Sequence, residues 1–322
     1  MNATSTAATA APVESKSFKP HAALIAVQLI FGTWPVVGKI ALLSLPSTGL
    51  VTFRIVGATL AFLLIRRATT GHAPIKGRGD FARLALYSLL GVVLNQFLFV
   101  KGLELSNVIN SALIGSTIPI FTLLVSVFLG YERGSWRVAV GLLLAACGVA
   151  YLINPASTSF SRETNIGNVI LLLNSMAYGA YLAISQNMIK RYGALPVITW
   201  IFIFGSFITL PIGGYNLAKL SLSSVPLSAW IAMLYIILVP TVVAYYLNAW
   251  ALGRVAPSIV AIYIYLQPLI AFAVAPLVLG EQLNSRTWLA TALIFAGLAT
   301  VTLRSRSRVL EEVSERPEAL GR

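Results

Sequence analysis

Residues 257–281 read PSIVAIYIYLQPLIAFAVAPLVLGE. This stretch is apolar over more than the roughly 20 residues that a helix needs to cross a bilayer. Gln267 and Pro268 nevertheless fall near its middle. A polar side chain and a helix-breaking residue at that depth are costly in lipid. The stretch therefore indicates a membrane helix with a functional centre.

The same spacing of proline and glutamate occurs a second time in the chain, 149 positions earlier. Pro268 corresponds to Pro119, and Glu281 corresponds to Glu132. One gapless offset aligns the two regions from about residue 89 to about residue 150 of the earlier copy. This pattern indicates a duplicated membrane unit. A duplication that serves only helix packing is the alternative interpretation.

The composition indicates an integral membrane protein. Of the 322 residues, 57% are hydrophobic and 10% are charged, and mean hydropathy is +0.84, whereas soluble domains carry about 25% charged residues. The net charge of +13 comes mainly from loops and tails, so it is better explained by membrane topology than by nucleic-acid binding. Cys147 is the single cysteine and no phosphate-binding GxxxxGK[ST] loop occurs, so we expect no metal, no cofactor and no ATP hydrolysis.

The expected fold class is all-α and integral to the membrane, with ten transmembrane helices arranged as two inverted five-helix repeats. Five is an odd number, so the second repeat enters the membrane from the opposite side. The predicted spans are approximately 22–44, 48–65, 82–102, 107–130, 136–154, 166–187, 196–214, 228–250, 257–280 and 286–303. The predicted organisation is an N-terminal tail (1–21), a first repeat (22–154), an external linker (155–165), a second repeat (166–303) and a C-terminal tail (304–322).

The distribution of Lys and Arg predicts the orientation. With the N-terminus inside, 17 of the 23 basic residues fall in cytoplasmic segments. The positive-inside rule then places both termini in the cytoplasm. We expect a multi-pass protein of the plasma membrane, which is the inner membrane in a bacterium.

Several motifs resemble those of a known family. Residues 31–39 (FGTWPVVGK), Arg54, and the Pro-containing helix 257–280 followed by Gly-Glu and a last helix bearing Gly297 resemble the EamA-type branch of the drug/metabolite transporter superfamily. The resemblance covers about residues 22–303 and implies a ten-helix carrier of small metabolites. One departure is that the first repeat has Gly-Tyr-Glu at 130–132 where the second has Gly-Glu.

The charged candidates for a site are Lys39 and Arg54, with Lys101 nearby in the predicted topology. Charges inside spans are expensive and usually face a cavity. Such a basic cluster would suit a substrate carboxylate or phosphate. The alternative, strongest for Lys39 and Lys101, is that the long side chains reach the outer interface.

Polar and aromatic residues provide the rest of the predicted cavity. On the sixth helix Asn174, Tyr178, Tyr181 and Ser185 share one face, as Tyr263 and Gln267 do on the ninth. The full predicted cavity set is Trp34, Lys39, Arg54, Asn95, Gln96, Tyr178, Tyr181, Tyr245, Asn248, Tyr263 and Gln267. The alternative for each is a hydrogen bond between helices that only aids packing.

Three prolines are predicted to break helices near mid-membrane: Pro119, Pro240 and Pro268. Pro240 corresponds to Gly91 at the same offset, so both repeats are expected to bend at equivalent points. Each break is either a static kink or a moving hinge.

The predicted function is a secondary transporter, an exporter or permease of a small amphipathic or anionic metabolite such as an amino acid, that works by alternating access. The alternatives are a channel-like facilitator and a membrane component that transports nothing. An enzyme is not expected, because no span carries a His, Asp or Glu at mid-depth. The expected partners are a substrate and the lipid bilayer, without nucleic acid, and a homodimer is left open.

Overall fold

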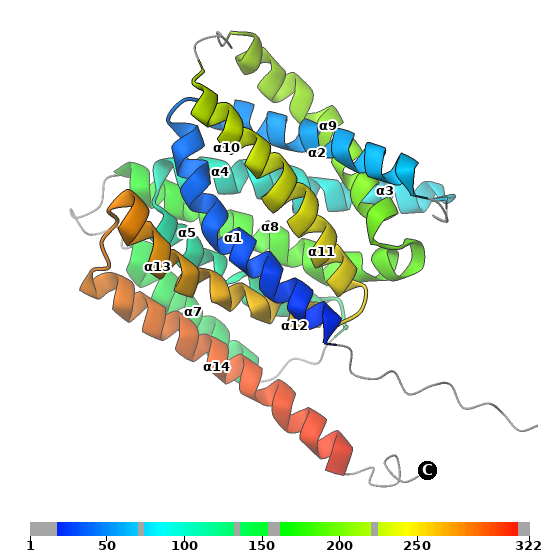
Figure 1. Ribbon diagram of the computed structural model, residues 1–322. Helices are drawn as coiled ribbons and strands as arrows, with labels where there is room; N and C mark the ends of the chain where they lie inside the picture. Colours follow the sequence, from blue (N-terminus) through cyan, green and yellow to red (C-terminus); the bar gives the residue numbers. More distant parts are fainter. Residues whose placement is uncertain (1–17, 70–73, 132–135, 154–161, 220–224, 315–322) are drawn as a thin grey trace, which may run out of the picture.

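A computed structural model describes residues 18–69, 74–131, 136–153, 162–219 and 225–314. Within these ranges the regular structure is helical, with no strand, and forms ten membrane-length segments (Figure 1). The first unit contains α1 (Lys19–Leu42), α2 (Ser47–Ala68), α3–η1–α4 (Arg78–Ser88, Leu89–Leu94, Asn95–Leu105), α5–α6 (Val108–Gly115, Ile118–Phe128) and α7 (Trp136–Ile153). The second contains α8 (Arg162–Tyr192), α9 (Ala194–Ala218), α10–η3–α11 (Leu227–Ile237, Leu238–Val243, Ala244–Leu252), α12–η4–α13 (Pro257–Ile262, Tyr263–Tyr265, Leu266–Leu279) and α14 (Ser285–Ser314).

The two units repeat in their irregularities as well as in their helices. The starts of α3, η1, α5 and α7 at residues 78, 89, 108 and 136 are matched by starts at 227, 238, 257 and 285, each 149 positions later. The sequence offset therefore extends to the backbone. Glu132 and most of the predicted linker 155–165 lie outside the described residues.

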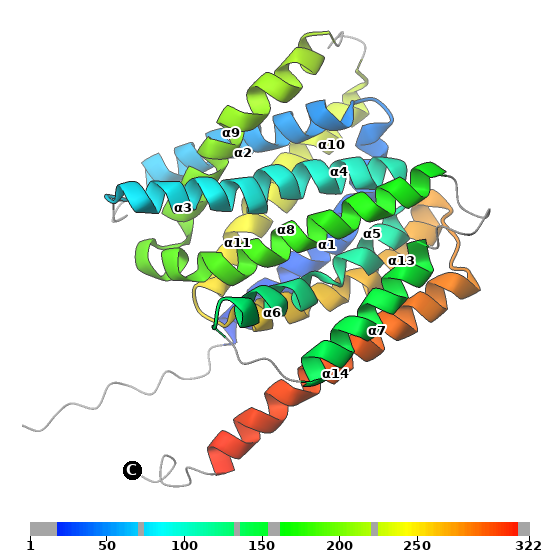
Figure 2. The same ribbon diagram turned by 180° about the vertical axis from the view of Figure 1, so that it is seen from behind.

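Among the described residues, eight of the ten segments are both long enough and apolar enough to cross a bilayer. The remaining two, α7 and α14, lie side by side at one edge of the bundle (Figures 1 and 2). Large apolar side chains on the outer surface, such as Leu64, Phe207 and Leu277, are 68%, 73% and 86% exposed. Such a surface suits lipid rather than water.

A single turn of π-helix interrupts the third segment of each unit, at Leu89–Leu94 and at Leu238–Val243. The second contains Pro240, which has no N–H to give to the carbonyl of Ile236. The hydroxyl of Thr241 donates to that carbonyl instead, at 2.7 Å. Each unit thus has a π-turn at the position where a bend is predicted, Gly91 in the first and Pro240 in the second.

The breaks predicted at Pro119 and Pro268 are also present. Helix α5 ends at Gly115 and α6 begins at Ile118, with two residues between them. A 3₁₀ turn at Tyr263–Tyr265 separates α12 from α13. The carbonyl of Ile114 at the first break accepts hydrogen bonds from the hydroxyls of Thr117 (2.6 Å) and Ser175 (3.1 Å). Irregular backbone inside a membrane is tolerated where protein satisfies it in this way.

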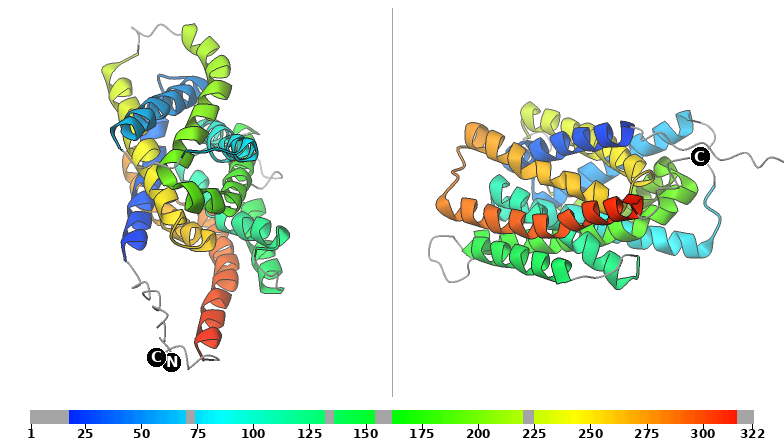
Figure 3. Two further views of the ribbon diagram at one scale, coloured as in Figure 1. Left: turned by 90° about the vertical axis from the view of Figure 1, so that its right-hand side faces the viewer. Right: turned by 90° about the horizontal axis from the view of Figure 1, so that it is seen from below.

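Both ends of the chain's helical part lie at one end of the bundle: the first residue of α1 and the last turn of α14 (Figures 1 and 3). This arrangement follows from an even number of crossings. The same end holds the last turn of α8, the first turn of α9 and the end of α11 (Figure 3). We call it the α1-start end, and the opposite end the α1-finish end.

Candidate functional site

A cavity of about 60 Å³ lies at the centre of the bundle, where the two units meet. Its walls come from α1, α2, α4, the α5–α6 break, α8, α11 and α13. The lining residues are Phe31, Trp34, Arg54, Asn95, Phe99, Gly115, Ile118, Asn174, Tyr178, Tyr245 and Gln267. The volume accommodates water, whereas sites for small molecules span about 300–1,000 Å³. The cavity must therefore widen to accept a metabolite.

Arg54 is the charged residue of this cavity, and it is 3% exposed. Its Nε donates to the Thr241 hydroxyl at 2.6 Å, and Nη2 lies 3.4 Å from the Pro240 carbonyl. The guanidinium carbon lies 4.3 Å from the centre of the Trp34 ring. Among the described residues no carboxylate forms an ion pair with Arg54. A buried cation without a counter-charge is an attractive site for an anion.

The orientation of Arg54 depends on the π-turn of the other unit. Pro240 frees the Ile236 carbonyl, which takes the hydroxyl proton of Thr241. The lone pairs of that hydroxyl then accept the N–H of Arg54. The predicted helix break at Pro240 thus contributes to the site through Thr241, a residue that the sequence analysis did not single out.

A chain of hydrogen bonds runs along one wall of the cavity. The Tyr245 hydroxyl donates to Asn95 Oδ1 at 2.9 Å, and Asn95 Nδ2 donates to Asn174 Oδ1 at 2.8 Å. Gln96 Nε2 lies 3.4 Å from the Tyr245 hydroxyl, while its buried Oε1 has no partner within the described structure. These amides and hydroxyls offer orientable donors and acceptors beside Arg54.

The rest of the cavity lining combines further amides with aromatic rings. Asn248 Nδ2 donates to the Tyr178 hydroxyl at 3.1 Å, and Gln267 Nε2 donates to Gln28 Oε1 at 2.7 Å. Apolar walls come from Phe31, Trp34 and Phe99, with the Trp34 and Phe99 rings 5.6 Å apart. The cavity is thus an apolar slot with one cation and several polar tips.

Of the eleven predicted cavity residues, the structure brings six to the walls: Trp34, Arg54, Asn95, Tyr178, Tyr245 and Gln267. Gln96 and Asn248 lie one hydrogen bond behind them. Tyr181 packs behind Tyr178, its ring centre 5.7 Å away. Gly91 leaves room for that ring, because a Cβ there would lie 2.5 Å from Tyr181 Cγ.

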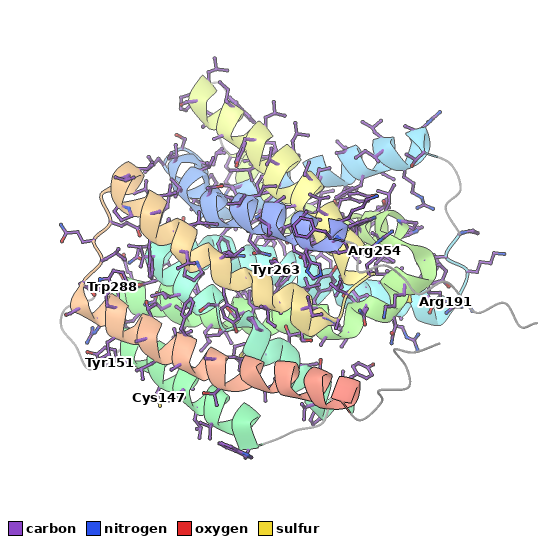
Figure 4. All side chains as sticks on the ribbon, turned by 60° about the horizontal axis from the view of Figure 1, so that its bottom comes forward. Cys147, Tyr151, Arg191, Arg254, Tyr263 and Trp288 are labelled. Carbon is purple, nitrogen blue, oxygen red and sulfur yellow. The ribbon has the colours of Figure 1, made fainter. Side chains whose placement is uncertain are left out.

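The other two predicted residues lie toward the ends of the bundle. Lys39 Nζ donates to the Ser106 carbonyl at 2.5 Å, at the α1-finish end. This carbonyl follows the C-terminus of α4, and a helix C-terminus attracts cations. The Tyr263 hydroxyl lies 2.8 Å from His21 Nδ1, next to the start of α1 (Tyr263 is labelled in Figure 4). Lys101 is half-exposed and pairs with Glu104 at 2.6 Å.

The Pro119 break contributes Gly115 and Ile118 to the walls, and Pro268 sits one residue beyond Gln267. Phe31, Phe99, Gly115 and Ile118 were not predicted, because apolar residues carry no functional signal in a chain that is apolar nearly throughout. Asn174 belongs to the polar face predicted on the sixth helix. No group of three His, Cys, Asp or Glu gathers within the described ranges.

Contacts between the units lie at both ends of the cavity. At the α1-finish end, the Glu281 carboxylate accepts the backbone N–H groups of Val108 (2.8 Å) and Ile109 (2.9 Å) at the start of α5. Glu281 therefore caps the N-terminus of α5. At the α1-start end, Asp80 accepts hydrogen bonds from Arg191 (3.2 Å) and from the Tyr192 hydroxyl (2.6 Å).

Comparisons with known proteins agree with this architecture. A solved crystal structure matches with a TM-score of 0.61 at 20% identity, covering 90% of this chain and 98% of its own. An uncharacterized transporter of Bacillus subtilis, YetK, is 23% identical over 296 residues, covering 90% of this chain and 89% of the relative. The uncharacterized inner membrane transporter YedA of Escherichia coli K12 is 26% identical over 310 residues, covering 87% and 90%.

The family comparison is the most specific of these findings. The model of the EamA-like transporter family matches twice, at residues 19–154 and 165–303. The two matches correspond to the two five-helix units and together span most of the 322 residues. The chain therefore belongs to the EamA-like transporter family, a membrane transporter family within the drug/metabolite transporter superfamily.

Proposed function

We propose that this chain is a secondary carrier of a small amphipathic metabolite with an anionic group, such as an amino acid, and that the substrate's anion binds Arg54. The observation that carries the proposal is the burial of the Arg54 guanidinium in the cavity wall without a carboxylate among the described residues. A substrate carboxylate or phosphate would supply the missing charge with a bidentate geometry.

The rest of the cavity suits the body of such a substrate. The aromatic walls at Phe31, Trp34 and Phe99 would hold apolar parts, and the amides of Asn95, Asn174 and Gln267 would bind a polar tip. A metabolite with an anion, an apolar body and a second polar group uses all three features. An amino acid has this combination of groups.

The two units, proposed as residues 22–154 and 166–303, would rock about the cavity during transport. In the described structure, contacts between the units exist at both ends: Glu281 with the start of α5, and Asp80 with Arg191. Alternating access would break one set while the other persists. The small volume of the cavity, about 60 Å³, favours a carrier over an open pore.

The proposed setting is the plasma membrane, with both termini in the cytoplasm. The support is the Lys and Arg distribution: the α1-start end carries Arg66, Arg67, Lys76, Arg78, Lys190, Arg191 and Arg254. The α1-start end is then the cytoplasmic end and the α1-finish end is the outer one. The Escherichia coli relative named as an inner membrane transporter is consistent with that compartment.

A reconstituted system tests the proposal. Purified protein is screened by thermal shift against metabolite classes, and the compounds that stabilise it are assayed for counterflow in proteoliposomes. We expect anionic amphipathic compounds among the hits, with trans-stimulated uptake that a pore does not show. Hits restricted to cations or neutral sugars would contradict the proposal, as would flux without trans-stimulation.

Variants locate the site within the same assay. We expect Tyr178→Phe and Gln267→Ala to lower flux at wild-type membrane abundance. Asn216→Ala is the matched control, because its Nδ2 bonds Thr48 at the α1-finish end of the bundle, outside the cavity. Wild-type flux in both cavity variants would refute this location.

A further inference from the structure

A second hollow, of about 500 Å³, opens at the α1-start end of the bundle. It lies between the turn that joins α8 to α9 and the last turns of α11. Lys190, Gly193, Pro196, Tyr246, Trp250 and Arg254 are among its lining residues. None of them lines the central cavity. We call it the basic hollow.

The basic hollow carries two cations that are not neutralised. Lys190 and Arg254 are exposed, and within the described ranges neither forms an ion pair. Their neighbour Arg191 differs, because it pairs with Asp80 at 3.2 Å. Figure 4 shows Arg254 and Arg191 at the same end of the bundle, with Trp288 at the other. The hollow therefore offers positive charge to an external ligand rather than to this chain.

Arg254 follows the end of α11 and is held in place by Trp250 of that helix. Its Nη1 donates to the Trp250 carbonyl at 2.9 Å, and its guanidinium carbon lies 4.0 Å from the centre of the Trp250 ring. The hydrogen bond uses one N–H of the guanidinium, and the ring contact uses one of its faces. The remaining N–H groups are left for an anion, and the side chain loses less freedom when it binds one.

The surroundings point to an amphipathic ligand at the membrane interface. Trp250 lies two residues before the end of α11, where aromatic residues sit at the depth of lipid headgroups, and Tyr246 lies about one turn before it. Beyond Tyr246, which is 37% exposed, exposed apolar side chains continue along η3 and α10: Val243, Leu238, Leu234 and Ile231. They form a lipid-facing strip that starts at the hollow and runs toward the membrane centre.

We propose that the basic hollow binds the phosphate headgroup of an anionic phospholipid, with Lys190 and Arg254 on the phosphate and the acyl chains along the strip that begins at Tyr246. Free phosphate carries the same charge, but it has no apolar part that could contact the aromatic residues or the strip. Basic pockets between membrane helices at the cytoplasmic side are suited to anionic headgroups.

The test uses the full-length protein in a neutral detergent, with lipid titrated against thermal stability. The probes are dioleoyl phosphatidylglycerol, dioleoyl phosphatidylcholine and inorganic phosphate. The variant is Lys190→Gln/Arg254→Gln. The matched control is Arg66→Gln/Arg67→Gln, which removes the same charge at the same end of the bundle, on the last turn of α2 and away from the hollow.

We expect phosphatidylglycerol to raise the melting temperature of the wild type and of the control, and phosphatidylcholine and phosphate to leave it unchanged. In the hollow variant the apparent affinity for phosphatidylglycerol falls by roughly 25-fold, since each basic residue near an anionic surface contributes about fivefold. Equal affinity in the hollow variant and the control overturns the site. A shift of the same size with inorganic phosphate overturns the lipid as its ligand.

Discussion

Replacing Arg54 with glutamine separates a binding residue from a structural one. The side chain is buried, and its contacts in the described structure are the Thr241 hydroxyl at 2.6 Å, the Pro240 carbonyl at 3.4 Å and the Trp34 ring. A hydrogen bond from a charged group contributes about 1.5–3 kcal/mol, and a desolvated cation–π contact about 2 kcal/mol. Burying the Arg54 charge away from water costs several kcal/mol, and Arg54→Gln removes that cost.

These terms oppose each other, so the net change in stability of Arg54→Gln is small. We expect the free energy of unfolding to change by no more than about 2 kcal/mol, or roughly 5 °C in melting temperature. Substrate affinity behaves differently, because truncating one partner of a buried charge pair costs about 2–5 kcal/mol. The apparent KM for the anionic substrate should rise by roughly 30-fold or more.

The assay is counterflow in proteoliposomes, normalised to folded protein, together with thermal unfolding of the same preparations. Arg54→Lys keeps the charge but loses the planar fork, so its KM should lie between those of the wild type and Arg54→Gln. Two results would show that Arg54 does not bind the substrate. One is a large loss of thermal stability in Arg54→Gln with normal flux per folded molecule, and the other is an unchanged KM.

Three further predictions concern the scaffold of the site. Glu281→Ala leaves two N–H groups at the start of α5 without an acceptor and should destabilise the protein by about 1–3 kcal/mol, measured by thermal unfolding, while Glu281→Gln keeps one acceptor and should cost less. Gly91→Ala forces the Tyr181 ring to move and should cost about 1–3 kcal/mol in the same measurement, whereas Gly79→Ala, with nothing within 4 Å of the new Cβ, should be neutral. Thr241→Val removes the acceptor of Arg54 Nε and should lower flux at normal abundance, whereas Thr241→Ser should keep wild-type flux. Unchanged thermal stability in Glu281→Ala, equal stability changes in the two glycine variants, or normal flux in Thr241→Val would each contradict the structure.

Much of the fold was predictable, because membrane helices depend on length and hydropathy, which one sequence contains. The offset between Pro119 and Pro268 predicted the duplication, and the helix starts repeat at the same 149 positions. Gly91 and Pro240 predicted equivalent bends, since both weaken a helix. The form of the bend, a π-turn in each unit, depends on how the freed carbonyls find new donors, and that is a property of the folded structure.

The site was predictable only in part. Polar and aromatic residues stand out from an apolar background, so Trp34, Arg54, Asn95 and Tyr178 could be singled out, and the structure places them on one cavity. Lys39 stood out equally, yet its amine bonds the backbone carbonyl of Ser106 at the end of α4. Polarity alone does not distinguish a cavity face from a helix-end contact.

Other parts of the site had no sequence signal. Thr241 is one of many Ser and Thr residues in the spans, and its role follows from the packing of α2 against η3, about 190 residues apart in sequence. The aromatic walls at Phe31 and Phe99 resemble lipid-facing residues in composition. Which face of an apolar helix turns inward is decided by its neighbours rather than by its own pattern.

A double-mutant cycle measures whether the substrate's anion binds Arg54 within the central cavity. It compares binding of the best anionic hit and of its uncharged amide analogue to the wild type and to Arg54→Gln. If the anion binds Arg54, neutralising the ligand and neutralising Arg54 each weaken binding by roughly 30-fold or more, and doing both costs little beyond either one. Losses that simply multiply would show that the anion and Arg54 do not interact.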